Sequence, residues 1–152
     1  MVMYHQLRSA LGFLELGDPD CAWEELESLP AEERAHPVVL RMRVQIYRSK
    51  ERWMEMAEVA RHLTEIRPDQ PAHWTDRAWA ERRHLGIPVA QQTLLIARDL
   101  FPQEGIIHYN LACYVCQLGG LDEARKILAK AIQIEPTLRG AALEDEDLKA
   151  IW

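Results

Sequence analysis

The sequence lacks several features that mark whole classes of protein. Its three cysteines, an odd number in 152 residues, do not make a disulfide framework. No apolar run approaches the roughly 18 residues of a membrane-spanning helix. Acidic residues outnumber basic ones, and the net charge of −6 argues against a general nucleic-acid binder, which needs a basic surface. The composition therefore favours one globular domain with a sizeable core and neither membrane nor nucleic acid as a partner.

Sequence signatures of catalysis and export are also missing. There is no phosphate-binding loop, no GxGxxG and no nucleophile elbow, and the six scattered histidines form no HExxH arrangement. The first residues lack the basic head, apolar stretch and cleavage site of a signal peptide, so the cytoplasm is the default location. We expect no enzyme activity, no cofactor and no metal.

Cys113 and Cys116 form a C-x-x-C pair that raises the question of redox or metal chemistry. A thioredoxin-like pair sits at a helix N-terminus, where the helix dipole lowers the thiol pKa. This pair lies in the middle of an expected helix, and no second Cys or His pair follows at zinc-finger spacing. The interpretation favoured is two small residues that are buried or face a groove.

Two amphipathic helices are predicted between Gly105 and Pro136. Apolar residues recur at helical spacing on both sides of Gly119-Gly120, where glycine supplies the positive-φ freedom of a tight turn. Pro136 ends the second helix. One such hairpin cannot bury its own apolar stripe, so neighbours of the same kind are expected.

Those neighbours recur at a constant spacing of 34 residues. The same pattern of small residues, apolar residues and proline occurs 34 and 68 residues before the hairpin. It occurs again 102 residues before the hairpin, with fewer matching residues. The reference positions and their counterparts are His108, Ala112, Leu121, Ala124, Leu128, Ala131 and Pro136; Trp74, Ala78, Ile87, Ala90, Leu94, Ala97 and Pro102; Leu40, Val44, Trp53, Met56, Ala60, Leu63 and Pro68; and Gln6, Ala10, Pro19, Ala22, Leu26, Leu29 and Arg34.

This pattern resembles the tetratricopeptide repeat (TPR) family over residues 3–138. The resemblance implies an all-α fold, an α-solenoid with a right-handed superhelix, built from about four helix-turn-helix repeats and a C-terminal cap. The single domain would contain repeats at about 3–36, 37–70, 71–104 and 105–138, with the cap at 139–152. The first repeat departs most, because Pro19 and Arg34 replace the expected apolar residue and proline, and an irregular link is expected at 30–37.

The last residues continue the apolar spacing beyond the final repeat. A cap of one or two short helices is expected to cover the exposed edge of the last hairpin. The covering residues would be Leu138, Ala142, Leu143, Leu148 and Ile151. The acidic run 144–147 suits a helix N-terminus. The alternative is a frayed acidic tail.

In the resembling family, the first helix of each repeat lines a concave groove. Carried over to this chain, the positions that face the groove are Tyr4, Leu7, Leu11, Leu14 and Glu15; Val38, Arg41, Gln45, Arg48 and Ser49; Ala72, Thr75, Trp79, Arg82 and Arg83; and Ile106, Tyr109, Cys113, Cys116 and Gln117. From these, the partner-binding residues selected are Arg41, Gln45, Arg48, Thr75, Trp79, Arg82, Arg83, Tyr109, Cys113 and Gln117.

The selected residues combine arginines with aromatic rings, in a chain whose net charge is negative. Arginine pairs with carboxylates through two hydrogen bonds, and aromatic rings add contact area at low entropic cost. The set therefore suits an acidic or C-terminal peptide, although surface arginines paired with nearby glutamates remain the alternative. The carboxylate clamp of one family subgroup fits poorly, since Asp76 and Ala72 stand where donors are needed.

The function expected from the resemblance is protein–protein interaction, as an adaptor that binds a peptide or partner protein in the groove. Leu7, Leu11 and Leu14 form a second apolar stripe on the first helix. That stripe is either plain core or an exposed patch for self-association. A self-associating assembly protein is therefore one alternative. A secretion-type chaperone is another, since small acidic repeat proteins of about this length serve that role, although no residue here singles it out. A monomer is expected, with a homodimer as the other possibility.

Overall fold

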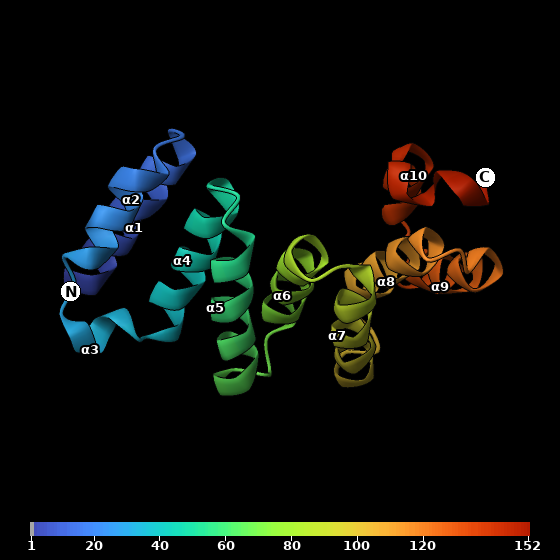
Figure 1. Cartoon of the computed structure of the whole chain (residues 1–152), viewed down its shortest axis with the longest axis horizontal. Coiled ribbons are helices and arrows are strands. Elements are labelled where there is room, and N and C mark those ends of the chain that lie inside the picture. The colour runs from blue at the N-terminus through green and yellow to red at the C-terminus, as the bar shows by residue number, and fades with distance from the viewer. Residues whose placement is uncertain (1) are drawn as a thin grey trace. The chain divides into compact units, whose positions relative to one another are not determined.

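The computed structural model describes residues 2–152, and its regular elements are all helices, with no strand in that range (Figure 1). The chain divides into two compact units, Met1–Ala80 and Glu81–Trp152, which we call the N-terminal unit and the C-terminal unit. The boundary falls inside helix α6 (Pro71–His84). None of the helices in the described range is long and apolar enough to cross a membrane.

The N-terminal unit is built from helical hairpins. Its helices before α6 are α1 (Val2–Glu15), α2 (Pro19–Glu27), α3 (Ala31–Arg34), α4 (Pro37–Ser49) and α5 (Trp53–Ile66). In this unit α1 packs against α2, and α4 packs against α5. The link expected to be irregular at 30–37 contains the one-turn helix α3, which is a difference from the sequence-based prediction.

The C-terminal unit repeats the same hairpin and then adds two short helices. Its elements after α6 are α7 (Ile87–Leu100), α8 (Gly105–Gln117), α9 (Leu121–Ile134), α10 (Leu138–Glu144) and the 3-10 helix η1 (Glu146–Ile151). Helix α8 packs against α7 and α9, and η1 lies on α8 and α9. At the α8–α9 turn Gly119 has a φ of +89°, while Gly120 is needed for space, because a Cβ there would lie 2.9 Å from Val115 Cγ1.

The 34-residue phase is confirmed by burial. At four of its positions the side chain is at most 3% exposed in every repeat, because these are the places where paired helices touch. The residues are Ala10, Val44, Ala78 and Ala112; Ala22, Met56, Ala90 and Ala124; Leu26, Ala60, Leu94 and Leu128; and Leu29, Leu63, Ala97 and Ala131. Alanine in most repeats at the first two positions lets the backbones approach closely, so the same spacing recurs down the chain.

A contact of the turn recurs with the same period. Trp74 donates from Nε1 to the carbonyl of Pro68 at 3.0 Å. Thirty-four residues later, His108 Nε2 lies 2.9 Å from the carbonyl of Pro102. In each case the first turn of a helix satisfies a carbonyl at the end of the preceding one, which ties successive hairpins together.

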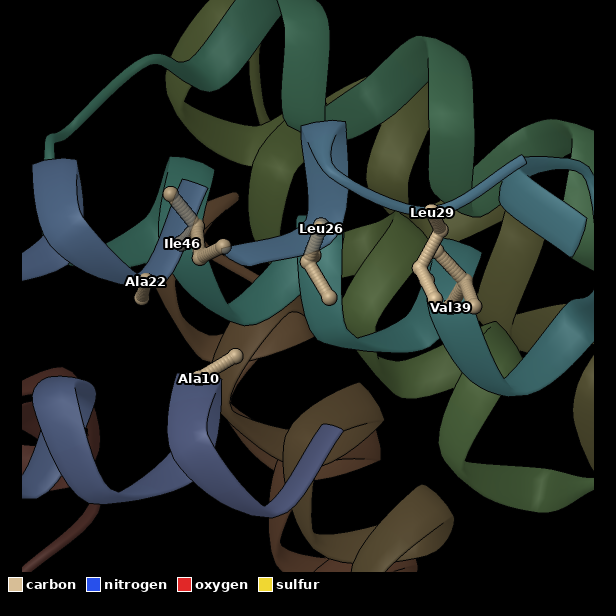
Figure 2. Packing of buried hydrophobic residues seen from close by; sticks show 6 residues of the cluster. All are labelled: Ala10, Ala22, Leu26, Leu29, Val39 and Ile46. Carbon is tan, nitrogen blue, oxygen red and sulfur yellow. The ribbon is translucent and has the colours of Figure 1, made fainter. Parts of the chain in front are cut away.

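The core of the first repeat forms where α1, α2 and α4 meet. Figure 2 shows its buried members, which are Ala10, Ala22, Leu26, Leu29, Val39 and Ile46. Leu7 and Leu14 pack against this cluster, whereas Leu11 is 47% exposed. The predicted leucine stripe is therefore partly core and partly surface.

The predicted cap is present as α10 and η1. Ala142, Leu148 and Ile151 are buried, as expected of residues that cover the last hairpin. Leu143 is 57% exposed, so its predicted covering role is wrong. Asp145 caps η1 by accepting a hydrogen bond from the Asp147 amide at 2.9 Å, which agrees with the acidic run marking a helix N-terminus.

Candidate partner-binding site

The N-terminal unit has a cavity of about 500 Å³ between α1 and α4, which we call the α1/α4 cavity. Apolar side chains line part of it, and polar and charged ones complete the rim. The lining residues are Leu11, Leu14, Glu15, Val38, Arg41, Met42, Gln45, Arg48 and Ser49. All five groove positions assigned to the second repeat are among them. Arg41 is exposed on the rim, and Arg48 and Gln45 are half-buried.

Arg48 is held between an aromatic ring and a carboxylate. Its guanidinium carbon lies 4.4 Å from the centroid of the Trp79 ring, and its Nη1 lies 3.7 Å from Asp76 Oδ1. Gln45 reaches the other carboxylate oxygen of Asp76 at 3.5 Å. Stacking on the ring fixes the direction of the guanidinium while part of it stays accessible.

Asp76 is the acidic group beneath this rim. Burial raises the pKa of Asp76, and the positive charges of Arg48 and Arg41 oppose that rise. Desolvation of the carboxylate therefore outweighs its attraction to the arginines. Asp76, a candidate clamp position in the sequence-based prediction, contacts Arg48 and Gln45 of this chain.

In the C-terminal unit, the predicted groove residues contact the end of the chain. Residues 145–151, which we call the C-terminal segment, lie on α8 through η1. Tyr109 donates from its hydroxyl to Asp145 Oδ2 at 2.6 Å, and Cys113 Sγ lies 3.8 Å from the same oxygen. Gln117 donates to the backbone carbonyl of Asp147 at 2.9 Å.

Arg82 pairs with the Asp147 carboxylate of this segment. Both of its terminal nitrogens bond the Asp147 carboxylate, with Nη2 at 2.8 Å from Oδ1. The guanidinium carbon also lies 5.3 Å from the centroid of the Tyr114 ring. The two-bond geometry is the one by which arginine recognises carboxylates. The hydrogen bond from Arg82 lowers the pKa of Asp147, so this carboxylate is charged at neutral pH.

The remaining predicted residues have other surroundings. Thr75 donates from its hydroxyl to the carbonyl of Ala72, one turn earlier in α6. Arg83 is exposed near the end of the same helix. Among the ten selected residues, the structure therefore brings together Arg41, Gln45 and Arg48 at one cavity. It brings together Arg82, Tyr109, Cys113 and Gln117 at the C-terminal segment.

The thiols show no sign of activation. Burial raises the pKa of Cys113, and the nearby charges of Asp145 and Asp147 raise it further. Cys113, Asp145 and Asp147 place one ligand atom each within 4.8 Å of one another. Arg82 and Tyr109 already bond these carboxylates, however, so donors of this chain engage them. The arrangement is suited to holding carboxylates rather than a cation.

Sequence reasoning missed the two carboxylates that occupy the site. The sequence predicts Asp145 and Asp147 only as residues that begin a helix. The available signal was an acidic run at the end of a chain whose groove positions carry arginines. The sequence shows that Asp76 cannot donate to a peptide carboxylate, but nothing in the sequence predicts its contact with Arg48.

Comparisons with known proteins agree with this architecture. No family model and no curated protein matches the sequence. Among solved structures, the first TPR of Spaghetti (RPAP3), bound to the HSP90 peptide SRMEEVD, is similar with 23% identity and a TM-score of 0.66. That likeness covers 76% of this chain and 89% of the other.

A second similar structure is the 41-to-end portion of MamA from Desulfovibrio magneticus RS-1. It is 15% identical, with a TM-score of 0.75, and the likeness covers 99% of this chain and 89% of that one. Both likenesses agree with the burial at the 34-residue phase and with the all-helical content. The chain therefore has the α-solenoid fold of tetratricopeptide repeat proteins.

Proposed function

We propose that this chain is a protein-interaction module, and that its α1/α4 cavity binds a segment of a partner protein. The observation that carries the proposal is the cavity itself. Its walls include Leu11, Leu14 and Met42, while Arg41 and Arg48 stand on the rim. Apolar walls that exclude water and a few charged groups that orient the ligand are the usual composition of a binding site.

The rim indicates what the bound segment carries. An apolar side chain would fill the cavity, and a carboxylate next to it would reach Arg41. Arg48 is already stacked on Trp79, so it adds a pre-oriented positive charge at little entropic cost. A bidentate arginine–carboxylate contact contributes roughly 1.5–3 kcal/mol where water is excluded and less at an open rim.

The peptide complex of the similar RPAP3 domain supports this interpretation. Its peptide, SRMEEVD, combines acidic residues with methionine and valine. That ligand belongs to RPAP3, and the clamp positions of this chain differ in charge, most clearly at Asp76. We therefore propose the same class of ligand, an acidic peptide with apolar anchors, without the same clamp.

A displayed library of random peptides tests the proposal directly. Selection on the wild-type chain is expected to enrich sequences with an aliphatic residue next to Asp or Glu. Arg41→Glu should abolish that enrichment, because it places a negative charge where the ligand carboxylate binds. Arg61→Glu is the matched control, since Arg61 is an exposed arginine of α5 that does not line the cavity.

Enrichment that is equal for the wild type and both variants would exclude the α1/α4 cavity as the binding site. Far-ultraviolet circular dichroism of each variant checks that its helical content is retained. Raising the salt concentration should lower the affinity of the selected peptides, because salt screens exposed charge pairs more than it affects apolar contacts.

Self-association is a second candidate, favoured by exposed apolar side chains on and just after α1. Tyr4, Leu11 and Leu16 are all exposed there. A contact with another protein, including a second copy, would cover these side chains. Sedimentation over a range of concentrations separates the two functions, because a monomer at every concentration contradicts self-association.

A further inference from the structure

The C-terminal segment occupies the residues that the TPR resemblance assigns to partner binding. In the C-terminal unit, Tyr109, Cys113 and Gln117 of α8 all contact Asp145 or Asp147. Arg82 holds the Asp147 carboxylate with two hydrogen bonds. The chain therefore presents its own acidic segment to this face in the manner of a bound peptide.

The contacts define a sequence pattern. Asp145 and Asp147 carry the two carboxylates, two positions apart, and Leu148 and Ile151 supply buried aliphatic side chains. Glu146 and Lys149 are exposed and paired with each other. The recognised features are thus acidic, any residue, acidic, aliphatic, any two residues, aliphatic.

We propose that the C-terminal segment is an intramolecular ligand, and that the α8 face beneath it binds a partner protein's segment with the same acidic and aliphatic pattern. This inference adds a second binding face to the one proposed at the α1/α4 cavity and names the class of partner. The chain's own segment then competes with the partner. The free chain binds weakly, and a partner with the full pattern replaces residues 145–151.

The structure favours an exchangeable contact over a permanent one. The segment is a single short 3-10 helix, whose hydrogen bonds have poorer geometry than those of an α-helix. The Arg82 and Asp147 side chains are 22% and 28% exposed, so solvent has access to the ion pair. A tethered ligand still competes effectively, because a short linker gives it a millimolar effective concentration.

The test uses a fluorescently labelled peptide of residues 143–152, LEDEDLKAIW, added to the full-length chain. Wild type is expected to bind it weakly. A chain with Asp145→Asn and Asp147→Asn should bind it about tenfold more tightly, because its own segment loses charge-assisted bonds and occupies the face less often. A peptide with asparagine at the same two positions is the matched control and should lose this gain.

Adding Arg82→Gln to the double variant should cancel the gain in affinity, since the peptide's carboxylate loses its partner. Equal affinity of the wild type and a helical, folded double variant would overturn the proposal. So would binding that does not depend on Arg82 or on the peptide carboxylates. A concentration-dependent wild-type dimer that requires Arg82 would make the occupant a second copy, and would overturn the assignment to a different protein.

A measurement on the unaltered chain keeps the proposal testable if the variants fold poorly. Saturating LEDEDLKAIW should accelerate hydrogen exchange of the chain's own amides at 146–151, and the asparagine peptide should not. Unchanged exchange would contradict displacement. The site of the readout separates this result from the proposed function. In Arg48→Glu, whose α1/α4 cavity is altered, LEDEDLKAIW should still accelerate hydrogen exchange at 146–151.

Discussion

Arg48 and Arg82 lie 34 residues apart, at the same position of successive repeats, and their surroundings share a plan. Each guanidinium lies near an aromatic ring, Trp79 for one and Tyr114 for the other. Each also pairs with an aspartate. In the N-terminal unit that aspartate comes from α6, beside an accessible cavity, whereas in the C-terminal unit it comes from the end of the chain.

The difference shows how the same repeat position has two different roles. Where the counter-ion comes from a neighbouring helix, the arginine is oriented and the cavity beside it remains open. Where the counter-ion comes from a terminal segment, the same position holds that segment in place. The repeat supplies the donor, and the element packed next to it determines which carboxylate that donor meets.

The largest effect should come from the aliphatic anchor of the C-terminal segment. Leu148 has no exposed surface, so Leu148→Ala leaves a cavity and should destabilise the chain by about 2–5 kcal/mol. Leu143→Ala, at an exposed position of the preceding helix, should cost less than about 0.5 kcal/mol. Urea unfolding of both variants measures the difference. Similar costs for the two would mean that the segment does not cover the last hairpin.

The two arginines themselves give the next comparison. Arg82→Gln removes a two-bond contact with a partly buried aspartate and should cost about 1–2 kcal/mol. Arg48→Gln removes a longer contact from a side chain that is 39% exposed, and should cost below about 0.5 kcal/mol. Thermal unfolding of the two variants tests this order. The reverse order would contradict the view that only Arg82 holds a segment in place.

The turns of the two units provide a third comparison. Glu51, between α4 and α5, has a φ of +54°, and the equivalent turns of the first and last hairpins have Gly17 and Gly119. A side chain with a Cβ is strained in this conformation, and glycine is not. Glu51→Gly should therefore stabilise the N-terminal unit by about 0.5–1 kcal/mol. Gly119→Ala is the opposite control and should destabilise by about 1 kcal/mol; thermal unfolding midpoints measure both.

The positions that could be predicted from the sequence are those that see the same neighbours in every repeat. Ala10, Ala112 and Ala124 are buried because each meets the paired helix at the same depth. A repeated neighbour produces a repeated residue type, so the 34-residue phase was sufficient to find them. Trp74 and His108 differ chemically, yet both reach a proline carbonyl from the same position.

Prediction was weaker where the phase ends. Beyond residue 138 there is no equivalent position with which to compare, so apolar spacing alone could not distinguish the buried Leu148 from the exposed Leu143. The partners of Arg48 and Arg82 depend on which carboxylate the tertiary path brings near. Asp76 and Asp147 lie on other elements, far from these arginines in sequence, and no local pattern marks them.

The smallest predicted effect distinguishes the two units by the sign of their pH dependence. Arg82 lowers the pKa of Asp147 in the folded chain. Ionised Asp147 therefore stabilises the folded chain above the unfolded pKa of about 3.9, and this stabilisation is lost as the pH falls through the folded pKa. Burial raises the pKa of Asp76, so the protonated form is favoured by folding, and this stabilisation is lost as the pH rises through the folded pKa.

At pH 7, Asp147→Asn should therefore destabilise the chain and Asp76→Asn should stabilise it, each by about 1 kcal/mol or less. Both differences should vanish at pH values where the wild-type carboxylates are protonated in the folded chain. Hydrogen exchange at pH 7, followed separately in each unit, gives the sign for each variant. The same sign for both would mean that the carboxylate beneath Arg48 is as favourable to folding as the one on Arg82. The contrast between an oriented arginine at an open cavity and one that holds a segment would then fail.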